Sequence, residues 1–427
     1  MVAHGSTNSK KNKFIYKGYY LAFFCVTSLF FMWAVANNLN DVLTKHFQNA
    51  LDLTPTQSSY IATVYFLGYF FMALPAGLIM HRIGYKGGII VGLTLFACGV
   101  FLFYPGAYIR SFGFFLFALA IIASGVTFLE TAANPFITIM GSPETASQRL
   151  NFAQSFNGLG AFVALILGGS FILSDTHISK AEIASWTPEV QEAYRVSEAL
   201  SVQTPYLIFG CVVVVLIVLF SLVKMPDVSK KMVVKIENQE PTTASYSRLR
   251  LAIVAQFFAV GSQIAVSVHY INFAQSVHPS LTDSWAAYYV AFSMAGFMIG
   301  RFFGTFLLSF ISAAQLLLLY FSLCIPLSIG AIFFDGIFAV ICYGLLLTFI
   351  SIGFPTIFSM GITGLGRRTK LGSSLLIMSI AGAALIPLSF AKVAELTNSW
   401  QIAMIVPMVA FLVVIAFAVY CIKKPQI

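Results

Sequence analysis

Long apolar runs separated by short polar segments dominate the pattern of hydrophobic and polar positions along this chain. Each run has about twenty residues or more, the length that an α-helix needs to cross a hydrocarbon core about 30 Å thick. A helix also satisfies its own backbone hydrogen bonds, as lipid requires. The pattern predicts membrane-spanning helices at 19–41, 58–80, 88–108, 112–140, 152–174, 204–224, 249–274, 284–310, 315–334, 336–360, 372–393 and 400–422.

The twelve predicted spans fall into two halves of six. The expected units are a cytoplasmic tail (1–18), a first six-helix half (19–224), a cytoplasmic linker (225–248), a second half (249–422) and a cytoplasmic tail (423–427). Residues 134–141, near the end of the fourth span, are similar to residues 354–361, near the end of the tenth. Because each half has an even number of spans, both have the same orientation. We therefore expect an all-α membrane protein built from two parallel repeats, the arrangement of major facilitator transporters.

Composition and charge agree with a membrane protein. Hydrophobic residues make up 59% of the chain and charged residues 9%, against about 25% charged in soluble proteins. The net charge of +9 does not indicate nucleic-acid binding, because the basic residues lie in short clusters between spans. Most of these clusters fall in cytoplasmic segments if the N-terminus is inside. We expect a multi-pass protein of a bacterial inner membrane with both ends in the cytoplasm.

The predicted spans contain the acidic residues Asp41 and Glu130 and, away from the span ends, one basic residue, Arg301; three other basic residues lie at span ends, namely Lys224, Arg250 and Lys392. A charged side chain at bilayer depth costs about 2.5–3.5 kcal/mol, so we expect Asp41, Glu130 and Arg301 each to have a functional or structural role. Glu130 lies well inside the fourth span and shares a helix face with Asn134. Intramembrane acids by default mark ion or proton pathways. The alternative for Glu130 is a structural pair with Arg301 or with a neighbouring helix.

Asp41 closes a polar face at the end of the first span. Helical spacing aligns Trp33, Asn37 and Asp41, with Asn38 beside the acid. Asp41 could simply mark the outer helix end in headgroup water, but the amides deeper in the same row favour a water-lined cavity. For Arg301 we favour a structural or gating role over substrate contact. For His269 we favour a satisfied polar group over a proton relay.

Amide side chains line two further spans. The fifth span has Asn151, Gln154 and Asn157 on one face, and the seventh has Gln256, Gln263, Ser267 and Tyr270 on one face. Amides donate and accept hydrogen bonds, as binding of a neutral hydroxyl-rich ligand requires. The alternative is hydrogen bonding between helices, worth about 0.6 kcal/mol each. No P-loop, zinc-protease motif or nucleophile elbow occurs, so we expect neither an enzyme nor a cofactor or metal site.

Several segments resemble the fucose:H+ symporter family of the major facilitator superfamily. They are 33–41, 77–86, 129–136, 153–157, 201–206, 300–302 and 355–359. The resemblance implies that Asp41 and Glu130 are a protonatable pair and that Asn38, Gln154 and Asn157 face a sugar. Related glucose/galactose importers tend to have Gln at the position of Glu130, so this acid and the Asn37-Asn38 pair favour the fucose branch.

This chain departs from the family pattern at three places. His81 replaces an aspartate of the loop between spans two and three, and Phe354 replaces a tyrosine typical of the fucose branch. The seventh span, around Gln263 and His269, lacks the aromatic-rich pattern of that branch.

The resulting hypothesis is a proton-coupled importer of a neutral monosaccharide, L-fucose or a close relative, driven by the proton gradient and working as a monomer in the lipid bilayer. The expected proton-coupling residues are Asp41 and Glu130; the expected substrate-binding residues are Trp33, Asn37, Asn38, Asn134, Gln154, Asn157, Gln263, Ser267, Tyr270 and Phe354; and the expected structural or gating residues are Arg82, Lys86 and Arg301. A glucose/galactose-type symporter is the nearest alternative. A drug exporter would need a more apolar cavity, and a sensor would need a signalling domain.

Overall fold

The computed structural model describes residues 13–50, 55–109, 111–171, 185–201, 203–223 and 240–424, and these residues form helices joined by short turns without a β-strand. The α-helices are α1 (Tyr20–Ala50), α2 (Pro55–Ile109), α3 (Phe112–Ile139), α4 (Ala146–Phe171), α6 (Pro188–Ser201), α7 (Gln203–Leu222), α9 (Thr243–Val268), α10 (Tyr270–Val277), α11 (Asp283–Leu307), α12 (Ala313–Phe333), α13 (Gly336–Ile350), α14 (Gly353–Ile362), α15 (Thr369–Met378), α16 (Gly382–Thr397), α17 (Trp400–Ala403) and α18 (Ile405–Lys423). Three 3₁₀ turns lie between them: η1 (Pro143–Thr145), η2 (Gly366–Arg368) and η3 (Ser379–Ala381).

These helices account for the predicted spans. Within the described ranges, eight helical segments are long and apolar enough to cross a bilayer, and α1 and α7 hold two shorter apolar stretches. One of the eight, Val64–Ile109, contains two spans, because the backbone at Gly84 leaves the helical conformation (φ 73°, ψ 178°). The positive φ suits glycine, which has no Cβ to clash. The chain thus turns back between spans two and three, and α4 adds the fifth span of a major facilitator fold.

Four spans of the second half are interrupted rather than continuous, among them the twelfth, which is divided into α17 and α18. The seventh breaks at His269, between α9 and α10, and the tenth breaks between α13 and α14. The eleventh is interrupted by η3. The apolar pattern predicts each of these spans as one run, because hydrophobicity does not distinguish a broken helix from a straight one. Outside the spans, Pro188 and Glu189 form the first turn of the short helix α6, where a fixed proline φ and an acid are both favourable.

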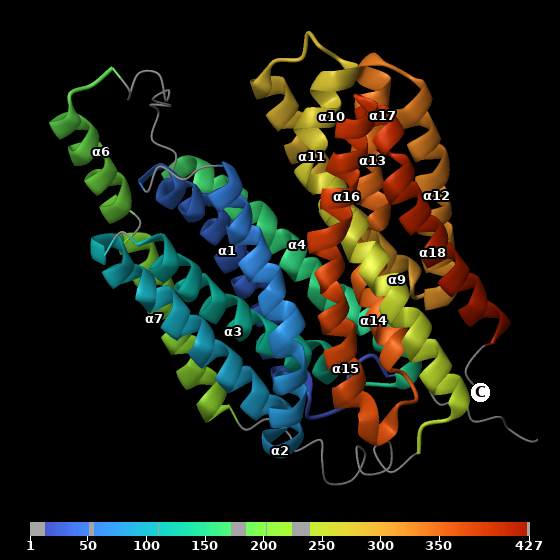
Figure 1. The fold of residues 1–427 in the computed structure, drawn as a ribbon. Coiled ribbons are helices and arrows are strands. Elements are labelled where there is room, and N and C mark those ends of the chain that lie inside the picture. The colour runs from blue at the N-terminus through green and yellow to red at the C-terminus, as the bar shows by residue number, and fades with distance from the viewer. Residues whose placement is uncertain are drawn as a thin grey trace, which may run out of the picture.

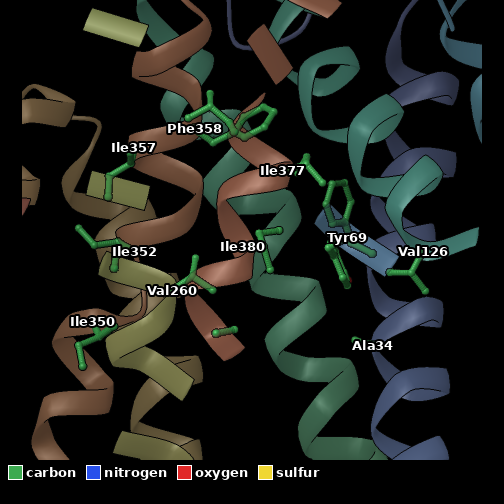
Figure 2. Packing of buried hydrophobic residues seen from close by; sticks show 14 of the residues in the cluster. Ala34, Tyr69, Val126, Val260, Ile350, Ile352, Ile357, Phe358, Ile377 and Ile380 are labelled. Atoms are coloured by element: carbon green, nitrogen blue, oxygen red, sulfur yellow. The ribbon is translucent and has the colours of Figure 1, made fainter. Parts of the chain in front are cut away.

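The two halves meet at one end of the bundle. Helix α4 packs against α11 and α14, and α2 packs against α15. In Figure 1 the helices of the halves lie together at the lower end of the view and diverge toward the upper end. Figure 2 shows the interior at close range, with Tyr69 of α2 among buried aliphatic residues such as Val126 and Ile377.

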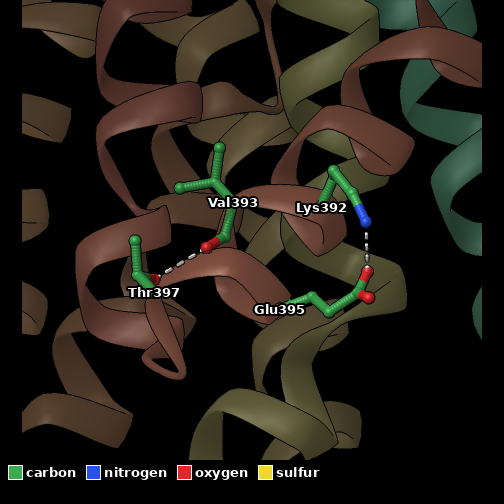
Figure 3. A network of polar contacts seen from close by, with 4 residues as sticks. All are labelled: Lys392, Val393, Glu395 and Thr397. Atoms are coloured by element: carbon green, nitrogen blue, oxygen red, sulfur yellow. Dashed lines mark hydrogen bonds and ion pairs between the residues drawn. The ribbon is translucent and has the colours of Figure 1, made fainter.

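Helix α9 begins at Thr243, before the predicted start of the seventh span at 249. The side chain of Thr242 caps it by accepting a hydrogen bond from the backbone N–H of Ser245 (3.2 Å), and so the last residues of the predicted linker are helical. At the opposite end of the second half, Lys392 and Glu395 form an exposed ion pair (3.0 Å) in α16 (Figure 3). Exposed pairs of this kind contribute little to stability.

Candidate functional site

Glu130 of α3 is half-buried in the interior of the first half. Its Oε1 atom accepts a hydrogen bond from the hydroxyl of Tyr69 of α2 (3.0 Å). Among the described residues, no basic side chain lies within ion-pair distance of the carboxyl group, so the alternative of a pair with Arg301 is not observed. A carboxyl group without a fixed counter-charge can gain and lose a proton without breaking a salt bridge.

A row of polar side chains leads from Glu130 to the fifth span. Asn134, one helical turn further along α3, donates from Nδ2 to the backbone carbonyl of Glu130 (2.9 Å). Its Oδ1 accepts from Nε2 of Gln154 of α4 (3.0 Å). Both amides are buried. The structure therefore brings together three of the predicted site residues, from two helices.

Arg301 of α11 joins this row to the second half. It is only 3% exposed, and its Nη1 donates to the backbone carbonyl of Gln154 (2.9 Å) while its Nε donates to that of Ser351 (2.8 Å). The guanidinium also lies over the ring of Phe297, 4.5 Å from its centroid. The planar fork of arginine suits two carbonyls and an aromatic face at once. Arg301 thus bridges the two halves directly below the polar row.

Fewer side chains of the first span are described. Helix α1 contains Asp41 and Asn37, but their side chains lie outside the described residues. Asn38 is half-buried and donates to the carbonyl of Ala34 in its own helix (2.8 Å). Asn157 of α4 is half-buried and donates to the carbonyl of Phe30 (3.3 Å). Among the described residues no donor bonds to either amide oxygen, so both can accept a hydrogen bond from a ligand.

Trp33 lies in an apolar environment. It is 5% exposed and contacts Phe30 at 4.4 Å between ring centroids. It lines an apolar crevice between α1, α2, α3 and α7 together with Leu93, Leu129 and Val213. Its role as a ligand-stacking residue stays a prediction.

In the second half, the predicted face of the seventh span divides into accessible and buried residues. Gln263 and Ser267 are half-buried, and so is Phe354, which stacks on Phe358 of α14 at 5.8 Å. Tyr270 is buried, and its hydroxyl donates to the carbonyl of Val340 (3.1 Å). Its polar group is therefore used within the second half.

His269 is only partly satisfied as a polar group, because its buried Nδ1 has no hydrogen-bond partner among the described residues. It lies at the break of the seventh span, where its Nε2 is 3.2 Å from the carbonyl oxygen of Pro387. The imidazole also contacts the ring of Trp400 at 5.1 Å between centroids.

Lys86 and Arg82 follow the second span at the end where the halves meet. Lys86 Nζ donates to the carbonyls of Ser221 and Val223 (2.9 Å each), at the C-terminal end of α7. A cation there complements the helix dipole and satisfies free carbonyls. Lys86 thus ties the third span to the sixth within one half. Arg82 is exposed.

Sequence reasoning missed two residues, Arg149 and Tyr69. Arg149 counts in the sequence as a basic loop residue, yet it is fully buried and donates to the carbonyls of Ile137 (3.1 Å), Thr138 and Phe14 (3.0 Å). It therefore fixes residues 13–16 against the end of α3. Tyr69 could have been noticed, because Tyr65 and Tyr69 repeat at helical spacing in the second span.

Polar contacts close the end where the halves meet. Ser147 of α4 contacts Ser359 of α14 (Oγ–Oγ 2.6 Å), and Asn151 donates to Thr356 (3.0 Å). Nearby, Gln148 donates to Ser309 (2.7 Å). These contacts involve neutral side chains, so they can break without leaving a buried charge. Such an interface suits an end that opens and closes.

Comparisons with known proteins agree with this geometry. A family model described as Major Facilitator Superfamily matches residues 21–366. The chain is 40% identical over 409 residues to the L-fucose-proton symporter of Escherichia coli (strain K12), covering 94% of this chain and 93% of that protein. It is 36% identical over 412 residues to the glucose/galactose transporter of Brucella abortus (strain 2308), covering 96% and 94%.

Solved structures give the same result. The crystal structure of the major facilitator transporter FucP in the outward conformation has a TM-score of 0.87 and 39% identity, covering 95% of this chain and 99% of that chain. This chain therefore belongs to the Major Facilitator Superfamily and, within it, to the fucose:proton symporter family.

Proposed function

We propose that this protein imports a neutral monosaccharide, L-fucose or a close 6-deoxy or aldohexose relative, together with a proton. The observation that carries the proposal is the environment of Glu130, a half-buried carboxyl group within a long apolar helix, with a hydroxyl donor and no cationic partner among the described residues. Relatives named as an L-fucose-proton symporter and as a glucose/galactose transporter support the substrate class.

The described amides give the proposed sugar site its chemistry. Asn38, Gln154 and Asn157 come from two helices of the first half, and the second half contributes the half-buried Gln263 and Phe354 to the proposed site. Amide groups can match both the donor and the acceptor side of a sugar hydroxyl, and an aromatic ring provides an apolar surface for the sugar's C–H face.

In the proposed cycle, a proton neutralises Asp41 or Glu130 while the site is open to the outside. The neutral site then closes over the sugar, and the halves rock about it and release sugar and proton inside. The two acids titrate as a coupled pair. The conformation with its Ser147–Ser359 end closed is the outward-facing one if that end is cytoplasmic, as the distribution of basic residues predicts. We further propose an inner-membrane location, cytoplasmic termini and a monomer without a cofactor.

Proteoliposomes with an imposed pH gradient test this function. We expect labelled L-fucose to accumulate in wild-type vesicles and to stop accumulating in Asp41→Asn, while sugar exchange persists because exchange needs no net proton movement. Glu130→Gln, which keeps the shape of the side chain, should also lose accumulation. Gradient-driven accumulation by Asp41→Asn would refute its assignment as the coupling residue. A sugar panel including glucose and galactose separates the fucose-type from the glucose/galactose-type symporter.

A further inference from the structure

Two tyrosines of the second span form a line of hydroxyl groups that ends at Glu130. The Tyr69 hydroxyl donates to Glu130 Oε1 (3.0 Å). Tyr65 lies four residues earlier on the same face of α2, with its ring centroid 5.7 Å from that of Tyr69. Three oxygen-bearing side chains thus follow one another from α2 to α3.

The line has a direction relative to the membrane. Helix α2 begins at Pro55, at the divergent end of the halves, and reaches the closed end near Gly77, where it packs against α15. Tyr65 is therefore one turn, about 6 Å, nearer the divergent end than Tyr69. Tyr65 is half-buried, whereas Tyr69 is only 4% exposed. The line runs from a partly accessible hydroxyl through a buried one to the acid.

The packing around Tyr69 holds the line in place. One residue before it, Gly68 lies so close to α3 that a Cβ added there would be 2.7 Å from the Cβ of Ala123. This close approach holds α2 against α3, so that Tyr69 can reach Glu130, which lies about two turns beyond Ala123. On its other side Tyr69 faces buried Ile377 of α15 (Figure 2). The phenol is thus confined to the orientation in which it meets Glu130.

We propose that Tyr65 and Tyr69 form a proton relay that loads Glu130 from the outer side of the membrane. A hydronium ion at Tyr65 gives a proton to its hydroxyl oxygen and becomes water, Tyr65 passes its own proton to Tyr69, and Tyr69 passes its own proton to the ionised Glu130. Each hydroxyl gains one proton and loses one, so the net result is a protonated Glu130 and two neutral tyrosines. No other reactant is needed.

The relay solves a problem that arises from the proposed function, on which it rests. A sugar held by Gln154 and Asn157 would occupy the space between the halves and displace water from that side of Glu130. The tyrosine line approaches the acid from within the first half, between α2 and α3. A proton can therefore reach Glu130 while the sugar is bound.

The test compares two transport modes in Tyr65→Phe, which removes one hydroxyl and leaves the Tyr69–Glu130 bond intact. We expect the maximal rate of gradient-driven uptake to fall about tenfold or more, with unchanged sugar KM and unchanged sugar exchange, and the solvent deuterium isotope effect on uptake to change. Tyr69→Phe should show the same loss of uptake. Tyr343→Phe is the matched control, because Tyr343 is equally buried in the other half and its hydroxyl has no hydrogen-bond partner in the part of the chain that the structure describes.

Wild-type uptake rates in Tyr65→Phe would overturn the relay and assign proton entry to water in direct contact with Glu130. An equal loss of uptake and exchange would also overturn it, because the hydroxyl would then support the fold. If the wild-type protein itself shows no gradient-driven accumulation, the proposed function fails rather than the relay.

Discussion

At Gly77, one added methyl group should shift the equilibrium between two conformations of the protein. In one of them the Ser147–Ser359 end is closed, and in the other this end is open. Gly77 lies on α2 where this helix meets α15, and a Cβ added there would be 1.9 Å from Ser374 Oγ, 3.1 Å from Ser374 Cβ and 3.3 Å from the carbonyl oxygen of Lys370. The Oγ atom can rotate away, but the Cβ and the carbonyl belong to the packed helix. Gly77→Ala should therefore be strained only while this end is closed.

Overpacking by one methylene-sized group costs about 1–3 kcal/mol in a well-packed interior. If opening relieves this strain, the ratio of open to closed molecules rises about 5- to 150-fold. The matched control is Gly158→Ala, at the α4–α11 contact between the halves, where an added Cβ meets only Met298 at 3.8 Å or more. Ser374→Gly should largely rescue Gly77→Ala, because it removes the two side-chain atoms that the new methyl group would meet and leaves only the carbonyl oxygen of Lys370 at 3.3 Å.

The assay is labelling of a cysteine placed at Ser359, which is 1% exposed at the closed end, in a chain whose six native cysteines are replaced. A membrane-impermeant maleimide applied from the closed side reacts only when this end opens. We expect faster labelling in Gly77→Ala, and near-reference rates in Gly158→Ala and in the rescued double variant. Labelling of Gly77→Ala at the reference rate would refute the assignment of this contact to a moving interface.

Three further changes test residues around the site. Arg301→Lys keeps the charge but loses the planar guanidinium that binds the carbonyls of Gln154 and Ser351. The free energy of unfolding should therefore fall by about 1.5–3 kcal/mol. An unchanged midpoint of thermal unfolding would contradict the bridging role. Phe354→Tyr adds a hydroxyl group, which would contribute about 0.5–1.5 kcal/mol if it bonds to the sugar. The KM for L-fucose uptake should therefore fall by up to about tenfold. Unchanged KM values for all sugars would show that residue 354 is not part of the site. Lys86→Ala removes a cation from the end of α7 and should lower stability by about 0.3–1 kcal/mol without changing sugar binding, as thermal unfolding and a binding titration would show.

The number and order of the spans follow from the sequence, because a bilayer accepts only segments of sufficient length and hydrophobicity. Glu130 could be singled out for a related reason, since a charged residue within such a segment is costly and therefore conspicuous. The break at Asp335-Gly336 and the start of α6 at Pro188 were also predictable, because local backbone preferences determine turns and helix starts. Breaks within spans were not, because an interrupted helix in a protein interior is as apolar as a continuous one.

The partners of these residues depend on the tertiary structure. Arg149 looks like a loop cation in the sequence, but carbonyl groups from the end of α3 and from Phe14 surround it once the helices pack. From the sequence, Arg301 could have paired with Glu130 or bound backbone carbonyls across the halves. Because α4 packs against α11, the guanidinium of Arg301 binds the carbonyl of Gln154. Hydrophobicity and helix spacing act along one segment and can be inferred from it. Hydrogen bonds between spans depend on which helices become neighbours, and here they join residues more than sixty positions apart, as Tyr69 and Glu130 show.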